Sequence, residues 1–237
     1  MTDYGQFCPV AKASELLVER WTILILRQLF LGTHRYSEFQ RALSRISPSL
    51  LTKRLKQLEA AGILVRKVQQ GRKGHDYFLT PVGKELAPIV EHLATWGMRW
   101  ARGQLDDNEL DVEFLMWDIQ RRLQTDKLAD GETVLCFIFD GLANFNSWWL
   151  VIRDGEVDLC TENPGKDVDL YINTTLRCLI EIWNGDADIR TALNKEQVKT
   201  QGDKQLARTM PDWLGICLYA DVRPGDPALK KIAVEDF

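Results

Sequence analysis

The sequence predicts two domains: a mostly α N-terminal domain with a single β-hairpin, and an α+β C-terminal domain. Three observations predict this division. The chain has 237 residues, more than one small domain needs. Its first half shows helical spacing of apolar residues around one hairpin, whereas its second half mixes strand and helix patterns. An acid-rich stretch separates the halves. We place the N-terminal domain at 1–103, a linker at 104–113 and the C-terminal domain at 114–237.

The composition excludes several classes of protein. Hydrophobic residues make up 45% and charged residues 27%, as in soluble globular proteins. The sequence contains no run of 18 apolar residues, and its start lacks the basic and apolar regions of a secretory signal. Five cysteines without a CxxC pair fit reduced thiols better than a disulfide framework. We therefore expect a cytoplasmic protein with no membrane association.

Charge is distributed unevenly along the chain. The net charge of −4 combines 16 basic and 8 acidic residues in 1–103 with 14 basic and 26 acidic residues in 104–237. A basic half is typical of proteins that bind a polyanion, most commonly nucleic acid. Two ordinary domains of different isoelectric point would give the same asymmetry, so charge alone leaves both interpretations open.

The N-terminal half is predicted to form helices over 10–18 and 20–31. A capping box with Ser37 as N-cap and Gln40 reaching back predicts a short helix to about Ser44. Ser47-Pro48 predicts the start of a further helix over 49–61. Strands at 63–69 and 75–79 flank a turn with two glycines, and one long helix is expected over 81–101.

The helix over 49–61 carries the most specific pattern. Leu51, Leu55 and Leu58 mark its buried stripe, and a polar, cationic set of residues shares another face. With the preceding helix it forms a helix-turn-helix, whose second helix enters the major groove of DNA. The hairpin would then be the wing of a winged helix, with a basic tip. The residues expected to contact DNA are Ser47, Ser49, Thr52, Lys53, Arg54, Lys56, Arg72, Lys73 and His75, of which Arg54, Arg72 and Lys73 would serve phosphates.

Taken singly, a basic helix face or a basic hairpin is usually a solvated surface, but their order is specific. Several segments together resemble the HxlR-type winged helix-turn-helix transcriptional regulators over roughly residues 7–102. These segments are Cys8-Pro9-Val10, Arg20-Trp21, Ile46-Ser47-Pro48, Leu51-Thr52-Lys53-Arg54-Leu55, Leu58-Glu59-Ala60-Ala61-Gly62-Ile63, Tyr77-Phe78-Leu79-Thr80-Pro81-Val82-Gly83 and Trp96-Gly97 with Trp100. The resemblance implies a prokaryotic homodimer that binds a palindromic operator in double-stranded DNA. It also implies that the helix after Pro81 and N-terminal segments form the dimer interface.

Cys8 precedes Pro9 at a predicted helix start, where a thiolate is favoured. Some regulators that resemble this chain sense oxidants with a cysteine at this position. An inert thiol that caps or packs is the alternative, and we favour it here. A thiol-dependent enzyme is a further alternative, but no base residue accompanies Cys8 in the sequence.

The C-terminal half is predicted to contain a helix over 111–128 and strands at 132–139, on both sides of Asp154-Gly155, and at 168–174. Helices over 175–184 and 186–193, a short strand at 196–201 and a helix over 203–210 follow. The tail from Arg223 has no clear pattern.

Part of this half resembles the sterol-carrier-protein-like domains. The residues that carry the resemblance are Asp169-Leu170-Tyr171-Ile172, 176–184, Gly185-Asp186-Ala187-Asp188, Ala192-Leu193 and Val198 to Gly202-Asp203. The resemblance implies an apolar cavity for a hydrophobic ligand. Aromatic side chains could line such a cavity, although core packing explains any single one. The candidate pocket residues are Phe137, Trp148, Trp149, Tyr171, Trp183 and Trp213.

The sequence contains no catalytic signature. All three histidines, His34, His75 and His92, lie in the N-terminal half, so the C-terminal half holds no histidine-based triad or metal site. We expect no enzyme activity, no cofactor and no bound metal. The favoured function is a homodimeric, sequence-specific DNA-binding transcriptional regulator, modulated by a hydrophobic ligand. The alternatives are a lipid carrier dimerised by a winged-helix domain and a redox-sensing regulator that uses Cys8.

Overall fold

A computed structural model describes residues 3–68, 74–101 and 106–226 of the chain. The chain divides between Thr95 and Trp96 into two compact units, which are described separately. In the residues that the structure describes, no helix is both long and apolar enough to cross a lipid bilayer.

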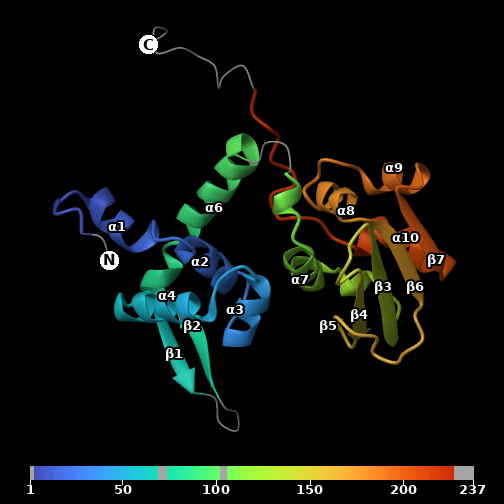
Figure 1. Ribbon diagram of the computed structural model, residues 1–237, viewed down its shortest axis with the longest axis horizontal. Helices are drawn as coiled ribbons and strands as arrows, with labels where there is room; N and C mark the ends of the chain where they lie inside the picture. Colours follow the sequence, from blue (N-terminus) through green and yellow to red (C-terminus); the bar gives the residue numbers. More distant parts are fainter. Residues whose placement is uncertain (1–2, 69–73, 102–105, 227–237) are drawn as a thin grey trace. The chain divides into compact units, whose positions relative to one another are not determined.

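The N-terminal unit is a helix-turn-helix followed by a two-stranded hairpin (Figure 1). Its core joins Ile25, Leu26 and Phe39 to the leucines of the predicted stripe. The fold class predicted for this half is confirmed. Its elements are α1 (Pro9–Leu17), α2 (Thr22–Phe30), α3 (Tyr36–Ala42), α4 (Pro48–Ala60), β1 (Leu64–Val68), β2 (His75–Leu79), α5 (Pro81–Lys84) and α6 (Ala87–Trp96).

Of the two N-caps predicted for the helix-turn-helix, one is confirmed and one is wrong. The predicted Ser47 cap of α4 is confirmed, because Ser47 Oγ accepts a hydrogen bond from Leu50 N–H at 3.3 Å. The Ser37 cap is wrong, since α3 begins at Tyr36. Glu38 Oε2 instead accepts bonds from the backbone N–H groups of His34 and Arg35 at 3.1 and 3.0 Å. The acidic side chain satisfies backbone donors at the positive end of the helix.

The long helix predicted over 81–101 is interrupted. It separates into α5, α6 and a π-helical turn at Gly97–Ala101. Pro88 lacks the N–H that would bond to the carbonyl of Lys84, so a continuous helix is disfavoured at this point. Gly83 in α5 lies so close to the hairpin that an added Cβ would meet the Ile63 carbonyl oxygen. The absence of a side chain at Gly83 therefore allows α5 to lie against the base of the hairpin.

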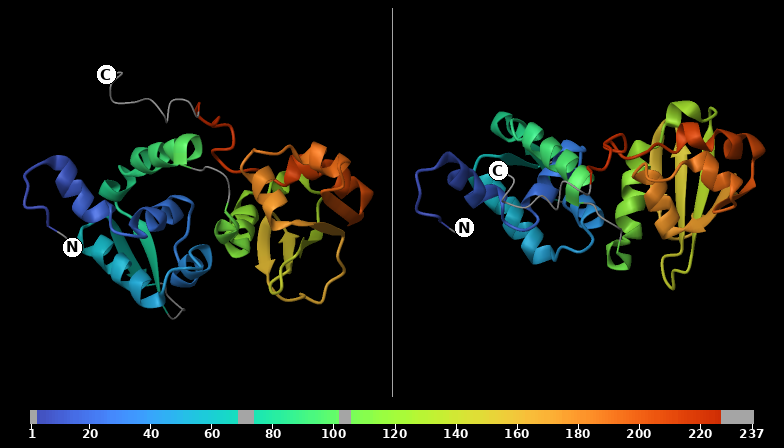
Figure 2. Two further views of the ribbon diagram at one scale, coloured as in Figure 1. Left: turned by 45° about the horizontal axis from the view of Figure 1, so that its top comes forward. Right: turned by 90° about the horizontal axis from the view of Figure 1, so that it is seen from above.

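The C-terminal unit contains one five-stranded sheet in the order β5-β4-β3-β6-β7 (Figure 2). The β3–β6 pair is parallel and the other pairs are antiparallel. The α+β class and the predicted hairpin at Asp154-Gly155 are confirmed. The elements are α7 (Val112–Arg122), β3 (Glu132–Asp140), β4 (Ser147–Arg153), β5 (Glu156–Cys160), β6 (Leu170–Thr175), α8 (Leu176–Trp183), α9 (Ile189–Asn194), β7 (Val198–Gly202) and α10 (Lys204–Trp213), with 3-10 turns at Asp107–Glu109 and Thr125–Lys127.

The core of this unit lies on one face of the sheet. Leu135, Phe137 and Phe139 alternate along β3 and contribute to the same apolar cluster as residues of α7, α8 and α10. Met116 from α7 and Trp213 from α10 are fully buried in it. The three helices therefore cover one face of the sheet.

The segment after α10 runs back along the ends of two helices. Arg122 Nε at the end of α7 donates to the Ile216 carbonyl at 2.8 Å, and Cys217 N–H donates to the Trp183 carbonyl of α8 at 2.8 Å. Further along, Gly225 N–H donates to the Arg99 carbonyl at 2.9 Å. The tail from Arg223 has no clear sequence pattern, and its described part contacts the π-helical turn at Gly97–Ala101.

Two glycines allow a matched test of this packing. Gly215 has φ +71 and would place a Cβ 2.4 Å from the Arg122 carbonyl oxygen, whereas Gly165 has φ +70 and nothing within 4 Å. We predict that Gly165→Ala destabilises the C-terminal unit by about 1 kcal/mol through its positive φ. Gly215→Ala should cost about 2–4 kcal/mol because overpacking adds to that strain. Urea denaturation followed by tryptophan fluorescence measures both, and equal costs would contradict the close approach.

Candidate nucleic-acid interface

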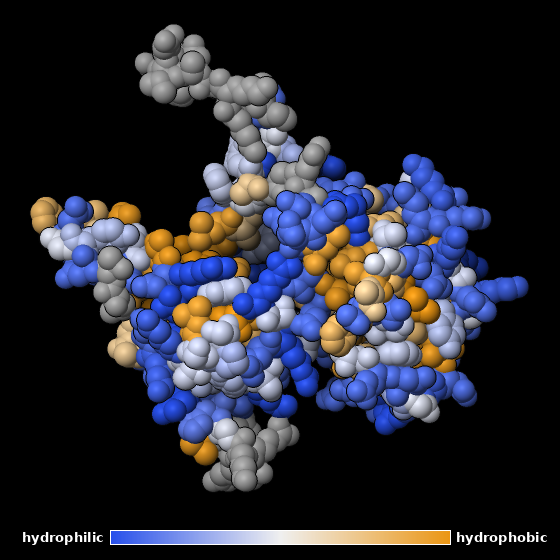
Figure 3. Space-filling view, in the orientation of Figure 1, coloured by the Kyte–Doolittle hydropathy of each residue, from blue (hydrophilic) through white to orange (hydrophobic). Residues whose placement is uncertain are grey.

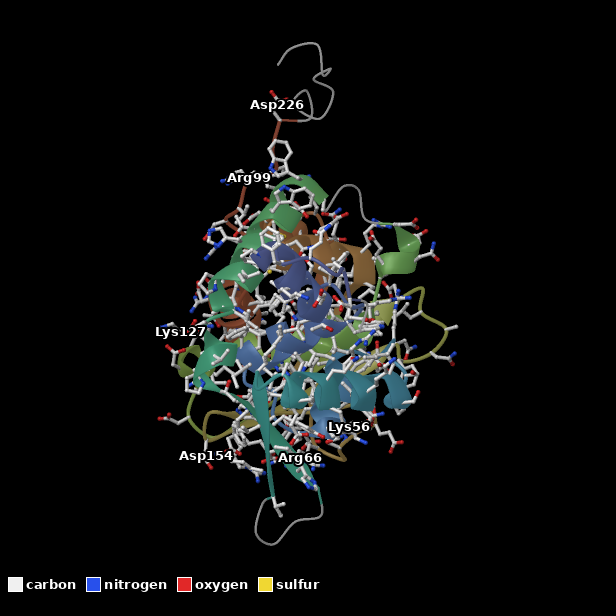
Figure 4. The ribbon with its side chains drawn as sticks, turned by 90° about the vertical axis from the view of Figure 1, so that its left-hand side faces the viewer. Lys56, Arg66, Arg99, Lys127, Asp154 and Asp226 are labelled. Carbon is white, nitrogen blue, oxygen red and sulfur yellow. The ribbon has the colours of Figure 1, made fainter. Side chains whose placement is uncertain are left out.

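The exposed face of α4 is polar and basic. Ser49, Thr52, Lys53 and Lys56 are all exposed, and the predicted leucine stripe on the inner side is at most 2% exposed. Glu59 is the one acidic residue of α4, and it pairs with Arg66 of β1 at 3.6 Å. Figure 4 labels Lys56 on α4 and Arg66 on the neighbouring strand. The outer face of α4 can therefore present cations and hydroxyls to a polyanion.

The N-terminus of α4 is fixed by a tyrosine that sequence reasoning missed. Tyr36 Oη at the start of α3 donates to the Pro48 carbonyl at 2.7 Å and lies 3.1 Å from Thr52 Oγ1. Thr52 Oγ1 also donates to the Pro48 carbonyl at 2.9 Å. The Thr52 hydroxyl proton is thus directed at the backbone, which leaves its oxygen as an acceptor. The sequence signal that could have revealed this contact is the tyrosine at the first position of α3, because its hydroxyl can bond to the backbone of a neighbouring helix.

The serines at this end of α4 share a contact. Ser47 Oγ caps the helix and lies 3.2 Å from Ser49 Oγ, and both side chains are exposed. Ser47 therefore has a structural function that does not depend on DNA. Contact of either serine with a phosphate stays a prediction.

Arg54 does not lie where the sequence predicted. Only 6% of the residue is exposed, and its guanidinium points to the interior, toward the turn between α1 and α2. It pairs there with Glu19 at 2.5 Å. The prediction that Arg54 contacts phosphates is wrong, because its position follows the buried side of α4 next to Leu51 and Leu55. Lys53 and Lys56 are therefore exposed and can contact DNA, whereas Arg54 is buried.

The hairpin has the form of a wing. β1 and β2 pair in antiparallel register from Leu64–Leu79 to Val68–His75, and an isolated bridge joins Arg35 to Asp76. His75 is exposed at the start of β2. Lys67 lies over the ring of Phe78 at 5.3 Å. Arg72 and Lys73, predicted at the tip, lie outside the described residues.

An apolar groove of about 660 Å³ lies between α1, α2 and α6. Hydrophobic residues gather along it in the space-filling view (Figure 3). Val10 is 73% exposed and Leu93 is 48% exposed, which is unusual for aliphatic side chains that line one groove. The groove is lined by Pro9, Val10, Ala13, Ser14, Leu17, Val18, Glu19, Arg20, Trp21, Ile23, Leu24, Ile89 and Leu93.

Cys8 is half-buried and occupies the N-cap position of α1. Its side chain does not cap the helix, while its carbonyl accepts from Lys12 N–H at 3.0 Å. The ammonium of Lys12, one turn further along α1, pairs with Glu15 at 3.1 Å and Asp3 at 3.4 Å. Redox sensing by Cys8 stays a prediction.

The six candidate pocket residues do not share one surface. Phe137 pairs with Trp148 and Ile172 across the sheet, whereas the adjacent Cys136 pairs with Trp149 and Tyr171. Because neighbouring residues of a strand point to opposite faces, Trp149 and Tyr171 lie on the face opposite the core. The prediction that all six line one pocket is therefore wrong.

The four remaining aromatics belong to the core side. Phe137, Trp148, Trp183 and Trp213 are each at most 6% exposed and contribute to one cluster. The indole N–H of Trp148 donates to the Phe145 carbonyl and that of Trp213 to the Leu206 carbonyl. That these four side chains line a ligand pocket stays a prediction.

The strand cysteines are unreactive by environment. Burial raises the pKa of the Cys136 thiol to about 11 and also raises the pKa of Cys160. Both thiols are therefore protonated near neutral pH.

Two family models match the chain. The model of the HxlR-like helix-turn-helix matches residues 16–104, and that of the SCP-2 sterol transfer family matches residues 118–214. The first match ends at the first residue of the predicted linker and covers the helix-turn-helix and the hairpin. The second begins after the linker and covers the five-stranded sheet.

Relatives of known sequence resemble the N-terminal part. The uncharacterized HTH-type transcriptional regulator YvaP of Bacillus subtilis is 39% identical over 100 residues, which are 41% of this chain and 93% of YvaP. The corresponding regulator sll1512 of Synechocystis is 37% identical over 99 residues, which are 41% of this chain and 73% of the relative. The solved structure of the redox regulator HypR in its reduced form is 32% identical, covers 38% of this chain and 90% of that chain, and has a TM-score of 0.36. The chain therefore belongs to the HxlR-like helix-turn-helix family of transcriptional regulators and carries a C-terminal domain of the SCP-2 sterol transfer family.

Proposed function

We propose that the protein is a cytoplasmic, homodimeric regulator that binds a palindromic operator through α4 and the wing and responds to a hydrophobic ligand. Residues 1–103 would bind DNA and dimerise, 104–113 would act as a linker, and 114–237 would hold the ligand. The single observation that carries the DNA-binding proposal is the outer face of α4. It combines exposed hydroxyls and lysines over a buried leucine stripe, and its only acidic residue is engaged by Arg66.

The proposed contacts follow from the geometry of α4. With this helix in the major groove, Lys53 and Lys56 reach phosphates or guanine edges, and Ser49 and Thr52 contact bases or backbone. At the N-terminus of α4, Pro48 has no N–H and the Leu50 N–H bonds to Ser47 Oγ, so the backbone N–H of Ser49 is the donor proposed for a phosphate. Arg72, Lys73 and His75 of the wing contact the phosphate backbone or the minor groove.

Lysine replacement on α4 tests this interface. We predict that Lys53→Met and Lys56→Met each weaken operator binding by about 1–3 kcal/mol and that each lost phosphate contact lowers the salt slope by about one. Fluorescence anisotropy over a range of salt concentrations measures both, with an operator obtained by selection. The control is Lys84→Met, which removes one exposed charge from α5. Unchanged affinity and slope in the α4 variants would remove this helix from the interface.

A second copy of the chain is the proposed occupant of the apolar groove between α1, α2 and α6. Its walls combine helices from both ends of the N-terminal unit, as the family resemblance implies for the dimer interface. Aliphatic side chains that are 45–73% exposed, such as Ile89 and Val10, favour burial by a partner surface. A dimer about a two-fold axis would place two copies of α4 on the two halves of a palindrome.

A charge placed in the groove should break this dimer. We predict that Leu93→Glu gives a folded monomer, because an unpaired carboxylate cannot be buried against an apolar partner. Sedimentation velocity measures the mass, and circular dichroism checks that the variant is folded. Val68→Glu is the control, because Val68 is 73% exposed at the end of β1 and does not line the groove. A Leu93→Glu protein that stays dimeric would place the interface elsewhere.

The C-terminal domain is proposed to sense a hydrophobic molecule without catalysis. Its membership of the SCP-2 sterol transfer family and its buried aromatic side chains on the helix-covered face support this assignment. A ligand that favours one dimer geometry would change operator affinity, because binding at two sites is thermodynamically coupled. The same family membership favours the alternative of a lipid carrier, whose ligand would leave DNA binding unchanged. Redox regulation through Cys8 is the other alternative.

A fluorescent fatty acid separates the sensor from the carrier. We predict that cis-parinaric acid binds the full-length protein, with energy transfer from its tryptophans, and changes operator affinity by about 5-fold or more, the lower range of allosteric coupling. Anisotropy titrations with and without the fatty acid measure the change, and Cys8→Ser tests whether the response needs the thiol. Binding of the fatty acid with no effect on operator affinity would favour the carrier.

A further inference from the structure

We propose that Arg54 is a positioning residue that fixes the recognition helix α4 to the turn between α1 and α2, and that it transmits occupancy of the apolar groove to operator binding. The inference rests on the proposed function and adds a structural link between the proposed dimer groove and the proposed DNA-binding face of α4. The geometry of the Arg54 side chain carries it.

Each of the three guanidinium nitrogens of Arg54 donates a hydrogen bond within the protein. Nε donates to the Arg20 carbonyl at 3.0 Å, Nη1 donates to Gln57 Oε1 at 2.7 Å, and Nη2 pairs with Glu19 Oε2 at 2.5 Å. The Arg54 side chain is 7% exposed and that of Glu19 is 28% exposed. The planar fork of arginine suits this arrangement, because it directs donors to a carboxylate and a carbonyl at once.

The turn that receives these bonds has an unusual backbone. Trp21 lies directly before α2 and has φ 79, in the left-handed region that non-glycine residues seldom adopt. Such a conformation persists only where neighbouring groups hold it. The Arg20 carbonyl that accepts from Arg54 belongs to the peptide that enters Trp21. Arg54 therefore helps to hold the turn, and the turn in return holds α4.

The same turn lines the apolar groove. Glu19, Arg20 and Trp21 belong to the groove wall, together with aliphatic residues of α1 and α6. A second copy seated in the groove would contact the residues that bind Arg54. Its presence would limit the movement of the turn and, through Arg54, the orientation of α4. Occupancy of the groove and the pose of the recognition helix are thus linked by one buried side chain.

Arg54 differs from its neighbours on α4 in that its side chain is not available to contact DNA. Lys53 and Lys56 on the same helix are exposed, whereas Arg54 lies on the side of the buried leucines. Its loss should affect the operator, which requires one orientation of α4, more than non-specific DNA, which requires only charge. A residue in contact with phosphate would affect both kinds of DNA.

Arg54→Met in the full-length protein tests the positioning role. Methionine keeps much of the apolar stem, and the freed Glu19 carboxylate can turn to solvent. We predict that operator affinity falls about tenfold or more, while affinity for non-specific DNA and its salt slope stay within error of wild type. Lys53→Met is the matched control on the same helix, and it should weaken binding to both DNAs. A wild-type operator affinity in the Arg54→Met protein would overturn the proposal.

A second measurement tests transmission from the groove and needs no DNA. Hydrogen exchange of the α4 backbone amides is compared in wild type, Leu93→Glu, Arg54→Met and the double variant. We predict that Leu93→Glu speeds exchange in α4 severalfold in the wild-type background and has no further effect beside Arg54→Met, because coupled residues are non-additive. Additive effects would mean that Arg54 only contributes stability, which overturns the transmission.

The two measurements also separate this proposal from the proposed function. A wild-type protein that selects no operator, but whose α4 exchange shows the non-additive pattern, would refute operator binding and support the Arg54 link. If Arg54→Met fails to fold, Glu19→Gln replaces it in both measurements. That variant keeps the side-chain size and one acceptor, and it is expected to act in the same direction with a smaller change.

Discussion

The N-terminal unit depends on one packing constraint, the burial of the leucine stripe of α4. Leu51, Leu55 and Leu58 pack in the same cluster as Ile25, Leu26 and Phe39 and are almost wholly removed from water. Each fully buried leucine contributes roughly 1.5–3 kcal/mol of hydrophobic free energy. Because the stripe fixes the rotation of α4 about its axis, it determines that Lys53 and Lys56 face solvent. The polar interactions of Tyr36 and Arg54 then refine the position of the helix.

The uneven charge of the chain follows its division into two structural units. Part of the basic excess of residues 1–103 lies on α4 and at the predicted wing, while Arg54 and Arg66 neutralise acidic neighbours inside the unit. The acidic excess belongs to a chain segment that forms a separate α+β unit with its own core. The net charge of −4 therefore describes neither unit. The basic part of the chain matches the HxlR-like helix-turn-helix model, and the acidic part matches the SCP-2 sterol transfer model.

The sequence predicted most elements because their signals are local. The leucine spacing of α4, the Ser47 cap and the Asp154-Gly155 turn each depend on residues close together in the chain. The errors have both local and distant causes. The Ser37 cap was wrong for a local reason, because Glu38 accepts bonds from backbone donors three and four residues upstream. Arg54 lies on the buried side of α4, and its carboxylate partner Glu19 is 35 positions away in the chain. The pocket prediction failed because sheet register, not aromatic content, decides which face Trp149 and Tyr171 occupy.

The central claim is that α4 reads DNA sequence from a two-fold symmetric dimer. The most direct measurement is selection of random genomic fragments by the purified full-length protein, followed by sequencing of the retained DNA. The account predicts enrichment of one palindromic sequence whose half-sites lie about one helical turn, roughly 34–36 Å, apart or a multiple of it. Retention of fragments with no common sequence, or of a single asymmetric half-site, would contradict it.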